Sequence, residues 1–225
     1  MFFVPRKIDS KIITLCKSIN KSSIAQFIKV APVKDAQLNE CVENVKKYVR
    51  EKGGEAVLGW AIWINPKILL EAEFHAVYKT KENELIDITP HKGDPTEILF
   101  LEDSSLKYEG CQINNKRKNI SGLKSVDRYI QILNEIFKIT NKDDFKYQSV
   151  EIRLRGEELK AYSGLKNEME MIEYELKDKL KLGPDMPCIC GSGKKLKKCC
   201  LDKIIQIRNS NHQSNNYINK QFPGN

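Results

Sequence analysis

Residues 68–90, which read ILLEAEFHAVYKTKENELIDITP, decide the fold predicted for this chain. Side chains in 68–80 alternate between two sets, and a period of two is typical of a β-strand. The apolar set is Leu70, Ala72, Phe74, Ala76 and Tyr78, and the other set is Glu71, Glu73, His75 and Val77. A polar turn at 81–83 then leads into ELIDIT (84–89), which is rich in strand-forming residues. The stretch therefore predicts a hairpin, with His75 in its first strand and Asp87 in its second.

The residues before and after this hairpin predict a mixture of strands and helices. AVLGWAIWIN (56–65), which ends at the turn Asn65-Pro66, and IAQFIKV (24–30) have the composition of strands. Between them an apolar stripe recurs every three to four residues and ends at Gly53-Gly54, as in a helix with a glycine cap. The stripe consists of Leu38, Cys41, Val42, Val45, Tyr48 and Val49. Further helices are expected from Asp9 to about Ile19, over Val126–Phe137, and from about Gly156 to Leu180.

These elements predict an α+β fold, in which a helix packs on a small antiparallel sheet and is followed by a long helix and a C-terminal cysteine-rich module. The expected boundaries are 1–155 for the α+β domain, 156–182 for an amphipathic helical linker, 183–203 for the cysteine module, and 204–225 for a disordered tail rich in Asn, Ser and Gln. The linker helix has an apolar stripe that would pack on the body or form a short coiled coil, and packing on the body is favoured. The stripe runs through Tyr162, Leu165, Met169, Ile172, Leu176 and Leu180.

The net charge of +8 comes from 38 Lys and Arg against 30 Asp and Glu, and most of it is C-terminal. Residues 181–225 hold eight basic and two acidic side chains, or +6, which leaves +2 for residues 1–180. A concentrated positive charge indicates an anionic partner. No apolar run reaches the ~20 residues of a membrane helix, and MFFVPRK at the start does not resemble a secretory signal. The seven cysteines are therefore expected in a reducing cytoplasm, as metal ligands or thiols rather than disulfides.

Four of the seven cysteines lie within thirteen residues, at Cys188, Cys190, Cys199 and Cys200. Four thiolates complete the tetrahedral shell of one structural Zn²⁺ ion. Gly191 and Gly193 permit the chain reversal that would fold the second pair of cysteines back on the first. A segment this short cannot bury a core, so metal binding would supply its folding energy. A redox-active cysteine cluster and unmetallated thiols are the alternatives.

The pattern C-x-C-G-S-G-K-K-x-x-x-C-C in residues 188–200 resembles the SEC-C motif, the zinc knuckle at the C-terminus of the preprotein translocase motor SecA and of several other bacterial proteins. The resemblance covers about 16 of the 225 residues and implies that the four cysteines hold one structural Zn²⁺. Members of this family use the knuckle to dock on a chaperone or the ribosome, which implies a similar partner here. The lysines that would face an anionic partner are Lys194, Lys195, Lys197 and Lys198. A solvated charged face is the alternative, and nucleic acid would bind only through this basic tail, since no aromatic stacking platform accompanies the lysines.

A second candidate site lies in the body, where Cys41 comes near a helix start, His75 in a strand and Asp87 in the adjoining strand. A nucleophilic cysteine works best at a helix N-terminus, whose dipole favours the thiolate. An imidazole on a strand across the helix would serve as its base, and a carboxylate on the next strand would fix the tautomer of that imidazole. The alternatives are a core cysteine, a structural histidine and a hairpin-end carboxylate. Glu71 and Glu73 share the strand face of His75. They are expected to contact a metal or the substrate, or else to belong to a solvated edge of the sheet.

Three segments of the body resemble papain-like, and particularly transglutaminase-like, proteins. EFHAV (73–77) matches the H-A-x-V strand of that superfamily. LIDITP (85–90) matches its D-x-T-P strand end, and Gly59-Trp60 matches its strand before the histidine. The resemblance covers roughly residues 35–95. It implies a thiol hydrolase or acyltransferase acting on amide or peptide bonds, in which Cys41 attacks, His75 acts as base and then acid, and Asp87 orients His75. The other hypothesis is a non-catalytic adaptor on the same scaffold, which binds through the zinc knuckle and its lysines.

Overall fold

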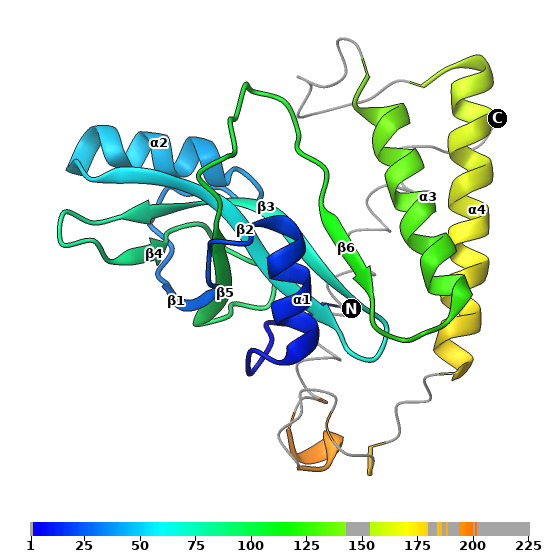
Figure 1. Ribbon diagram of the computed structural model, residues 1–225. Coiled ribbons are helices and arrows are strands. Elements are labelled where there is room, and N and C mark those ends of the chain that lie inside the picture. Colours follow the sequence, from blue (N-terminus) through cyan, green and yellow to red (C-terminus); the bar gives the residue numbers. More distant parts are fainter. Residues whose placement is uncertain are drawn as a thin grey trace.

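The α+β class predicted from the sequence is confirmed by the computed structural model, which describes residues 2–142, 154–179, 184–185, 188, 194–199 and 201 (Figure 1). The described elements are, in chain order, α1 (Ser10–Ile19), β1 (Gln26–Val30), α2 (Cys41–Lys52), β2 (Glu55–Asn65), β3 (Leu69–Lys79), β4 (Leu85–Asp87), β5 (Glu97–Glu102), β6 (Lys116–Asn119), α3 (Lys124–Thr140), α4 (Gly156–Lys179) and the 3-10 turn η2 (Leu196–Lys198).

The sheet closes into a small barrel. Its strand order is β2-β5-β1-β4-β3-β6, and β2 also pairs with β3, which joins the two ends of the first five strands. β6 adds to β3 at Leu69–Ala72, whereas β4 pairs with β3 at Tyr78 and Lys79. The pair β1–β4 is parallel. The sheet is therefore mixed, whereas the sequence predicts an antiparallel sheet. The order of elements explains this direction. α2 and the β2–β3 hairpin lie between β1 and β4 in the chain. Because β3 runs antiparallel to β2, and β4 antiparallel to β3, the chain reverses twice and β4 runs in the direction of β2, which is also the direction of β1.

The hairpin of β2 and β3 carries His75. Its register runs from Glu55 opposite Lys79 to Asn65 opposite Leu69, so both strands lie within one residue of their predicted bounds. β4 is shorter than the predicted strand 84–89 and ends at Asp87.

Helices cover the barrel on two faces (Figure 1). On one face, Ile12 and Leu15 of α1 are buried against the sheet. On another, Val42 and Val45 of α2 pack beside Ala76 of β3. The packing of α2 brings its N-terminal residue toward the strands that carry the other candidate site residues.

The barrel interior has no space for a side chain at Gly59. The interior residues include Ile28, Val57, Ala61, Val77, Ile98 and Phe100. A Cβ on Gly59 would lie 2.3 Å from the carbonyl oxygen of Leu101 and 2.5 Å from the ring of Phe100. Gly59 is the register partner of His75. A residue without a side chain is therefore required next to the candidate site.

α3 and α4 form an antiparallel pair beside the barrel (Figure 1). The buried side chains of their shared core include Val126, Ile132, Met169, Ile172 and Leu176. Arg128 of α3 donates two hydrogen bonds to Glu168 of α4, each of 2.7 Å. Four residues of the predicted stripe, Leu165, Met169, Ile172 and Leu176, therefore pack on the body, the alternative favoured from the sequence. Leu180 lies outside the described residues.

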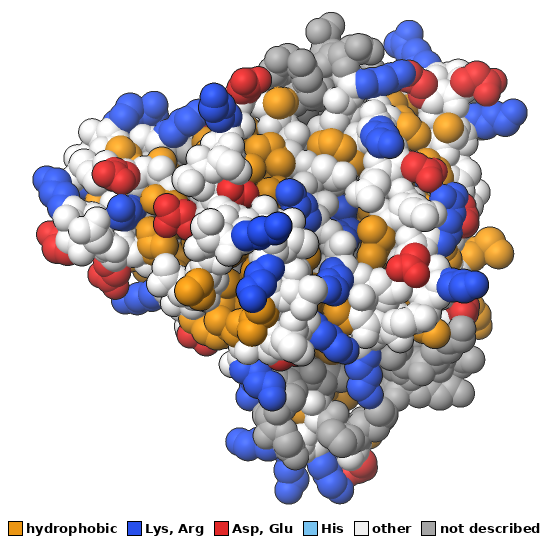
Figure 2. Space-filling model, in the orientation of Figure 1, with side chains coloured by type: hydrophobic (Ala, Val, Ile, Leu, Met, Phe, Trp, Pro, Cys, Tyr) orange, Lys and Arg blue, Asp and Glu red, His pale blue; other side chains and the backbone are white. Residues whose placement is uncertain are grey.

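Lys and Arg side chains gather on the face shown in Figure 2, over α1 and β6 and down to the lower end, where the described part of the cysteine module lies. The predicted tail 204–225 lies outside the described residues. None of the helices within the described ranges is long and apolar enough to cross a membrane.

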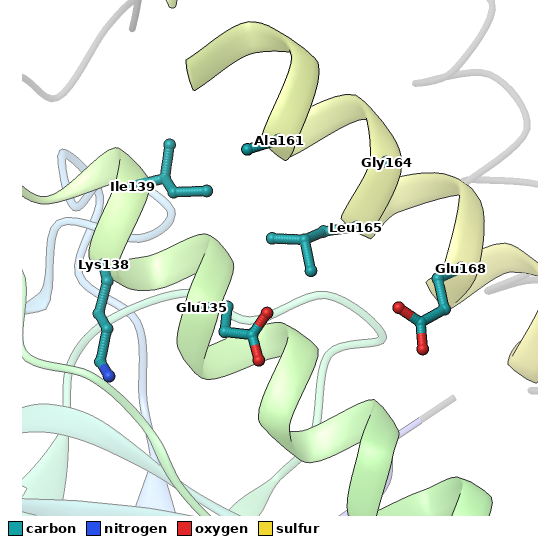
Figure 3. Close-up of a pocket in the computed structure, with 7 residues that line it drawn as sticks. All are labelled: Glu135, Lys138, Ile139, Ala161, Gly164, Leu165 and Glu168. Atoms are coloured by element: carbon teal, nitrogen blue, oxygen red, sulfur yellow. The ribbon is translucent and has the colours of Figure 1, made fainter. Parts of the chain in front are cut away.

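An open hollow lies between α3 and α4 (Figure 3). Its lining comprises Glu135, Lys138, Ile139, Ala161, Gly164, Leu165 and Glu168. These residues come from elements other than those that carry Cys41, His75 and Asp87. The hollow is a gap between two packed helices and brings no nucleophile together with a base.

Candidate functional site

Cys41 is the first residue of α2 and follows a sharp turn of the backbone. Asn39 has a φ of +66°, and Glu40 at the N-cap makes no side-chain hydrogen bond to the helix. The first backbone N–H groups of α2 therefore have no side-chain cap from Glu40. The Cys41 side chain is half-buried.

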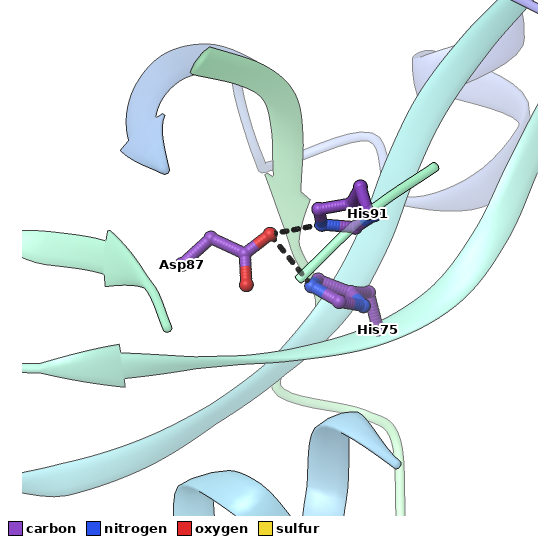
Figure 4. Close-up of side chains that lie close together, drawn as sticks. All are labelled: His75, Asp87 and His91. Atoms are coloured by element: carbon purple, nitrogen blue, oxygen red, sulfur yellow. Dashed lines mark hydrogen bonds and ion pairs between the residues drawn. The ribbon is translucent and has the colours of Figure 1, made fainter. Parts of the chain in front are cut away.

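His75 and Asp87 form a buried hydrogen bond between β3 and β4 (Figure 4). The distance from His75 Nε2 to Asp87 Oδ2 is 3.0 Å, and the two residues are 4% and 0% exposed. Cys41 lies close enough to the His75 ring to contribute to the raised pKa of that residue. Because Nε2 faces the carboxylate, Nδ1 is the ring nitrogen left for the thiol. The structure thus brings together the three residues singled out from the sequence.

The Asp87 carboxylate sets the charge of this cluster. Burial lowers the pKa of His75, but the hydrogen bond and the attraction of Asp87, with a smaller effect of Cys41, outweigh it and raise that pKa from 6.5 to about 10. Burial also opposes ionisation of Asp87, yet hydrogen bonds from His75 and His91 hold its pKa well below the ordinary value. At neutral pH the pair is therefore an imidazolium in contact with a carboxylate.

His91 is a member of the cluster that the sequence did not reveal. Its Nε2 lies 2.6 Å from the same Oδ2 of Asp87. The backbone N–H of Thr89 donates to the other oxygen of Asp87, at 2.9 Å, which closes a turn directly after β4. Pro90 and His91 follow that turn. The signal in the sequence was an Asp-x-Thr turn with a histidine four residues after the Asp.

Asn44, one turn after Cys41 in α2, connects the segments around the site. Its Oδ1 accepts the backbone N–H of Gln37 at 2.9 Å, and its Nδ2 donates to the carbonyl oxygen of Gln37 at 2.8 Å. Nδ2 also lies 3.3 Å from Thr89 Oγ1. Asn44 is 8% exposed, so one buried amide holds the loop before Cys41 and the turn after Asp87 against the same helix.

Aromatic side chains stand beside the thiol. Phe74 and Tyr108 stack with ring centroids 5.5 Å apart, and the ammonium of Lys46 lies 5.4 Å from the Tyr108 ring centroid. Burial raises the pKa of Tyr108, and negative charge at Cys41 and Glu43 adds to the effect. Cys41, Phe74 and Tyr108 border the same hydrophobic cluster.

Glu71 and Glu73, which share the strand parity of His75, have separate partners. Glu71 pairs with Arg117 across β3 and β6, and burial of Glu71 raises its pKa despite that partner. Glu73 accepts a hydrogen bond of 2.7 Å from the Trp63 indole. Each of the two carboxylates therefore already has a partner within the protein.

The ligand atoms of His75, Asp87 and His91 lie within 4.8 Å of one another, a spacing that one metal ion could also use. The Nε2 and Oδ2 atoms are already joined by hydrogen bonds. No buried side-chain polar atom in the described part of the chain lacks a partner. We therefore interpret the trio as a hydrogen-bonded group whose carboxylate is balanced by an imidazolium.

The described part of the cysteine module places two of the four predicted ligands in one small cluster. Cys188 is 4% exposed and packs with Leu196, while Cys199 and Phe3 border them. A guanidinium N–H of Arg6 donates to Cys199 Sγ at 3.3 Å. Such a contact suits a sulfur that carries negative charge, as a metal-bound thiolate does.

The other two predicted ligands, Cys190 and Cys200, lie outside the described residues. None of the described cysteines forms a disulfide; they are Cys16, Cys41, Cys111, Cys188 and Cys199. Cysteine thiolates such as those of Cys188 and Cys199 are ligands that Zn²⁺ accepts in proteins.

All four lysines of the module are exposed. Lys195 and Lys197 lie 3.1 and 2.8 Å from Asp185, and these two lysines lower the pKa of that carboxyl group. Exposed ion pairs of this kind contribute little free energy.

Comparison with known proteins supports the description of the C-terminal cysteine module. No curated protein and no solved structure matches the chain. A model of one family, the SEC-C motif, matches residues 187–202. The chain thus carries a SEC-C motif, a motif of the zinc-binding type, in its C-terminal cysteine module.

Proposed function

We propose that the body of this chain is a thiol hydrolase or acyltransferase of the papain-like, transglutaminase-like type, which acts on an amide or peptide bond. The observation that carries the proposal is the position of the His75 ring, which is hydrogen-bonded to Asp87 through Nε2 and lies close enough to Cys41 for that residue to influence its pKa. A base held between a nucleophile and an orienting carboxylate is the arrangement that thiol catalysis needs. The order of the three residues, on a helix start, a barrel strand and the next strand, supports the likeness to that superfamily.

The first half of the reaction transfers the acyl group to sulfur. The Cys41 thiolate attacks the carbonyl carbon, the C–N bond breaks, and His75 gives a proton to the departing amine. The backbone N–H of Cys41, at the uncapped start of α2, is the candidate donor to the carbonyl oxygen during attack. The products of this half are an acyl thioester on Cys41, a free amine and a neutral His75.

The second half releases the acyl group. Water or an amine attacks the thioester carbon while His75 takes its proton, and the C–S bond then breaks. The thiolate of Cys41 and the imidazolium of His75 are restored. Asp87 keeps Nε2–H of His75 engaged throughout, so that Nδ1 stays directed at the reacting atoms.

A reactive ester tests the proposal without knowledge of the substrate. p-Nitrophenyl acetate should acetylate Cys41 in a rapid burst, located by mass spectrometry, and Cys41→Ser or His75→Gln should abolish the burst. Cys16→Ser is the matched control, because burial raises the pKa of Cys16 to about 11 and keeps that thiol protonated. Equal acetylation of Cys41, Cys16 and Cys111 would leave the non-catalytic adaptor as the better hypothesis.

We further propose that the SEC-C module holds one structural Zn²⁺. The proposed ligands are Cys188, Cys190, Cys199 and Cys200. Support comes from the motif itself and from the closeness of Cys188 and Cys199. The bound ion would cross-link the two ends of a segment that is too short to form a core.

We also propose that this module docks the protein on an anionic partner in the cytoplasm, such as a ribosome or a chaperone. The support is the exposure of its lysines, which are Lys194, Lys195, Lys197 and Lys198. Co-sedimentation with ribosomes should weaken with added salt and should be lost when residues 183–225 are removed. Binding that survives both treatments would contradict the proposed role of the module.

A further inference from the structure

The carboxylate of Asp87 is fixed by three hydrogen bonds, and two of them reach the same oxygen. Oδ2 receives His91 Nε2 at 2.6 Å and His75 Nε2 at 3.0 Å. Oδ1 receives the backbone N–H of Thr89 at 2.9 Å. Because Asp87 is fully buried, water cannot replace a donor that is lost, and each of the three bonds constrains the rotation of the carboxylate.

The ring of His91 is itself held in place. Its centroid lies 5.3 Å from that of His75 and 5.5 Å from that of Trp63. Trp63 is anchored in turn by its indole hydrogen bond to Glu73. The His91 side chain is 12% exposed, so packing as well as hydrogen bonding directs its Nε2 at the carboxylate (Figure 4).

We propose that His91 is a positioning residue, which holds Asp87 Oδ2 against His75 and so keeps the His75 Nδ1 atom directed at Cys41. This inference rests on the proposed thiol chemistry for its catalytic consequence, but the geometric step stands on the hydrogen bonds alone. His91 acts through Asp87 and His75 and has no contact with the thiol among the contacts described. Loss of a partner that orients a reactive group commonly lowers activity about 10- to 100-fold.

Two amide variants separate a role in positioning from a role in packing. The side-chain nitrogen of glutamine reaches about as far as histidine Nε2, whereas that of asparagine reaches only as far as Nδ1. His91→Gln should therefore keep a donor on Asp87, and His91→Asn should not. Both remove the aromatic ring, so any loss caused by packing against Trp63 is shared by the two variants.

The experiment measures the His75 ring by ¹H–¹⁵N NMR and the rate at which Cys41 is acetylated. In the full chain and in His91→Gln we expect a downfield Nε2–H signal from His75 and similar rates. In His91→Asn the signal should be lost, and the rate should fall about 10- to 100-fold. Equal His75 signals and equal rates in the two variants would overturn the inference. Loss of the His75 signal in both variants, with circular dichroism showing an intact fold, would overturn it as well.

Two further outcomes distinguish this inference from its neighbours. If wild-type Cys41 is unreactive but the His75 signal disappears only in His91→Asn, the proposed function fails while the positioning role of His91 stands. If the purified chain holds a second metal ion that is lost in His91→Asn and retained in Cys199→Ser plus Cys200→Ser, the trio is a metal site and the inference is overturned.

Discussion

His75 Nε2 and Asp87 Oδ2 are 3.0 Å apart in a part of the barrel where Asp87 has no exposed surface. A charge in that position is stable only with a partner of opposite charge, because an unpaired buried carboxylate costs several kcal/mol. The same contact engages Nε2 and leaves Nδ1 as the ring nitrogen available for the proposed chemistry at Cys41. One hydrogen bond therefore contributes to folding and to the proposed chemistry.

The contribution of this pair to stability should depend on pH in a defined direction. Folding raises the pKa of His75 from 6.5 to about 10, so its contribution is complete below pH 6.5 and is lost as the pH rises through about 10. Folding lowers the pKa of Asp87 from 3.8, so its contribution is present above that pH and is lost as the pH falls further.

Urea unfolding of the wild type and of Asp87→Asn measures this contribution. We expect the variant to be less stable by about 3 kcal/mol near pH 5, because one member of a buried ion pair has been removed. The difference should shrink toward pH 10. Asp35→Asn, which changes an exposed carboxylate 3.9 Å from Lys47, should match the wild type at each pH. A difference that stays constant from pH 5 to pH 10 would contradict the proposed ion pair.

Asn44 should support the reactivity of Cys41 without contacting the substrate. Asn44→Asp retains the acceptor for the Gln37 N–H but loses the donors to Gln37 and Thr89. We expect it to lower the free energy of unfolding by about 1–3 kcal/mol and to slow the acetylation of Cys41. Asn141→Asp, in the C-cap of α3, provides the comparison, and equal acetylation rates in the two variants would argue against a role for Asn44.

Gly59→Ala should be among the most damaging small substitutions in the barrel. The added methyl group would lie 2.3 Å from a backbone oxygen, which has no rotamer by which to move away. We expect a loss of more than about 3 kcal/mol, above the usual range for overpacking. Gly164→Ala in α4 is the matched control, since no atom lies within 4 Å of its added Cβ, and it should raise the melting temperature slightly. A tolerated Gly59→Ala would show that the barrel is looser than described.

The SEC-C module should be coupled to the body through the N-terminal segment. Metal analysis should give about one zinc per chain, and Cys199→Ser plus Cys200→Ser should abolish it, whereas Cys16→Ser plus Cys111→Ser should not. Phe3 borders Cys188 and Leu196 and exchanges two backbone hydrogen bonds with Ile64. Removal of the metal should therefore speed amide hydrogen exchange at Phe3 and Ile64, and unchanged exchange would contradict the coupling.

The sequence predicts the local features of the site well. Strand β3 was predictable because its side chains alternate over eleven residues, and the polar turn that leads into β4 placed His75 and Asp87 on neighbouring strands. Cys41 was predictable as part of a helix, although its position as the first residue depends on the left-handed turn at Asn39. The spacing of the cysteines predicted the SEC-C motif directly.

Contacts between distant segments were not predictable in the same way. The parallel β1–β4 pair and the closure of the barrel depend on which distant segments of the chain come together. The local periodicity of hydrophobic residues does not encode such pairings. His91 reaches Asp87 only because the turn after β4 reverses the chain, and Arg6 meets Cys199 across 193 residues of sequence. The role of Asn44 depends on the fold, because its partners, Gln37 and Thr89, lie on two different loops.

The reactivity of Cys41 is the most direct test of the central claim. The wild-type chain should be alkylated by iodoacetamide at neutral pH selectively at Cys41, ahead of the buried Cys16 and of Cys111, and His75→Ala should remove that selectivity. Site-resolved mass spectrometry of the alkylation rates decides the matter. Fast, His75-dependent labelling of Cys41 is the result the account predicts, and labelling of Cys41 that is no faster than that of Cys111, or that is unaffected by His75→Ala, would contradict it.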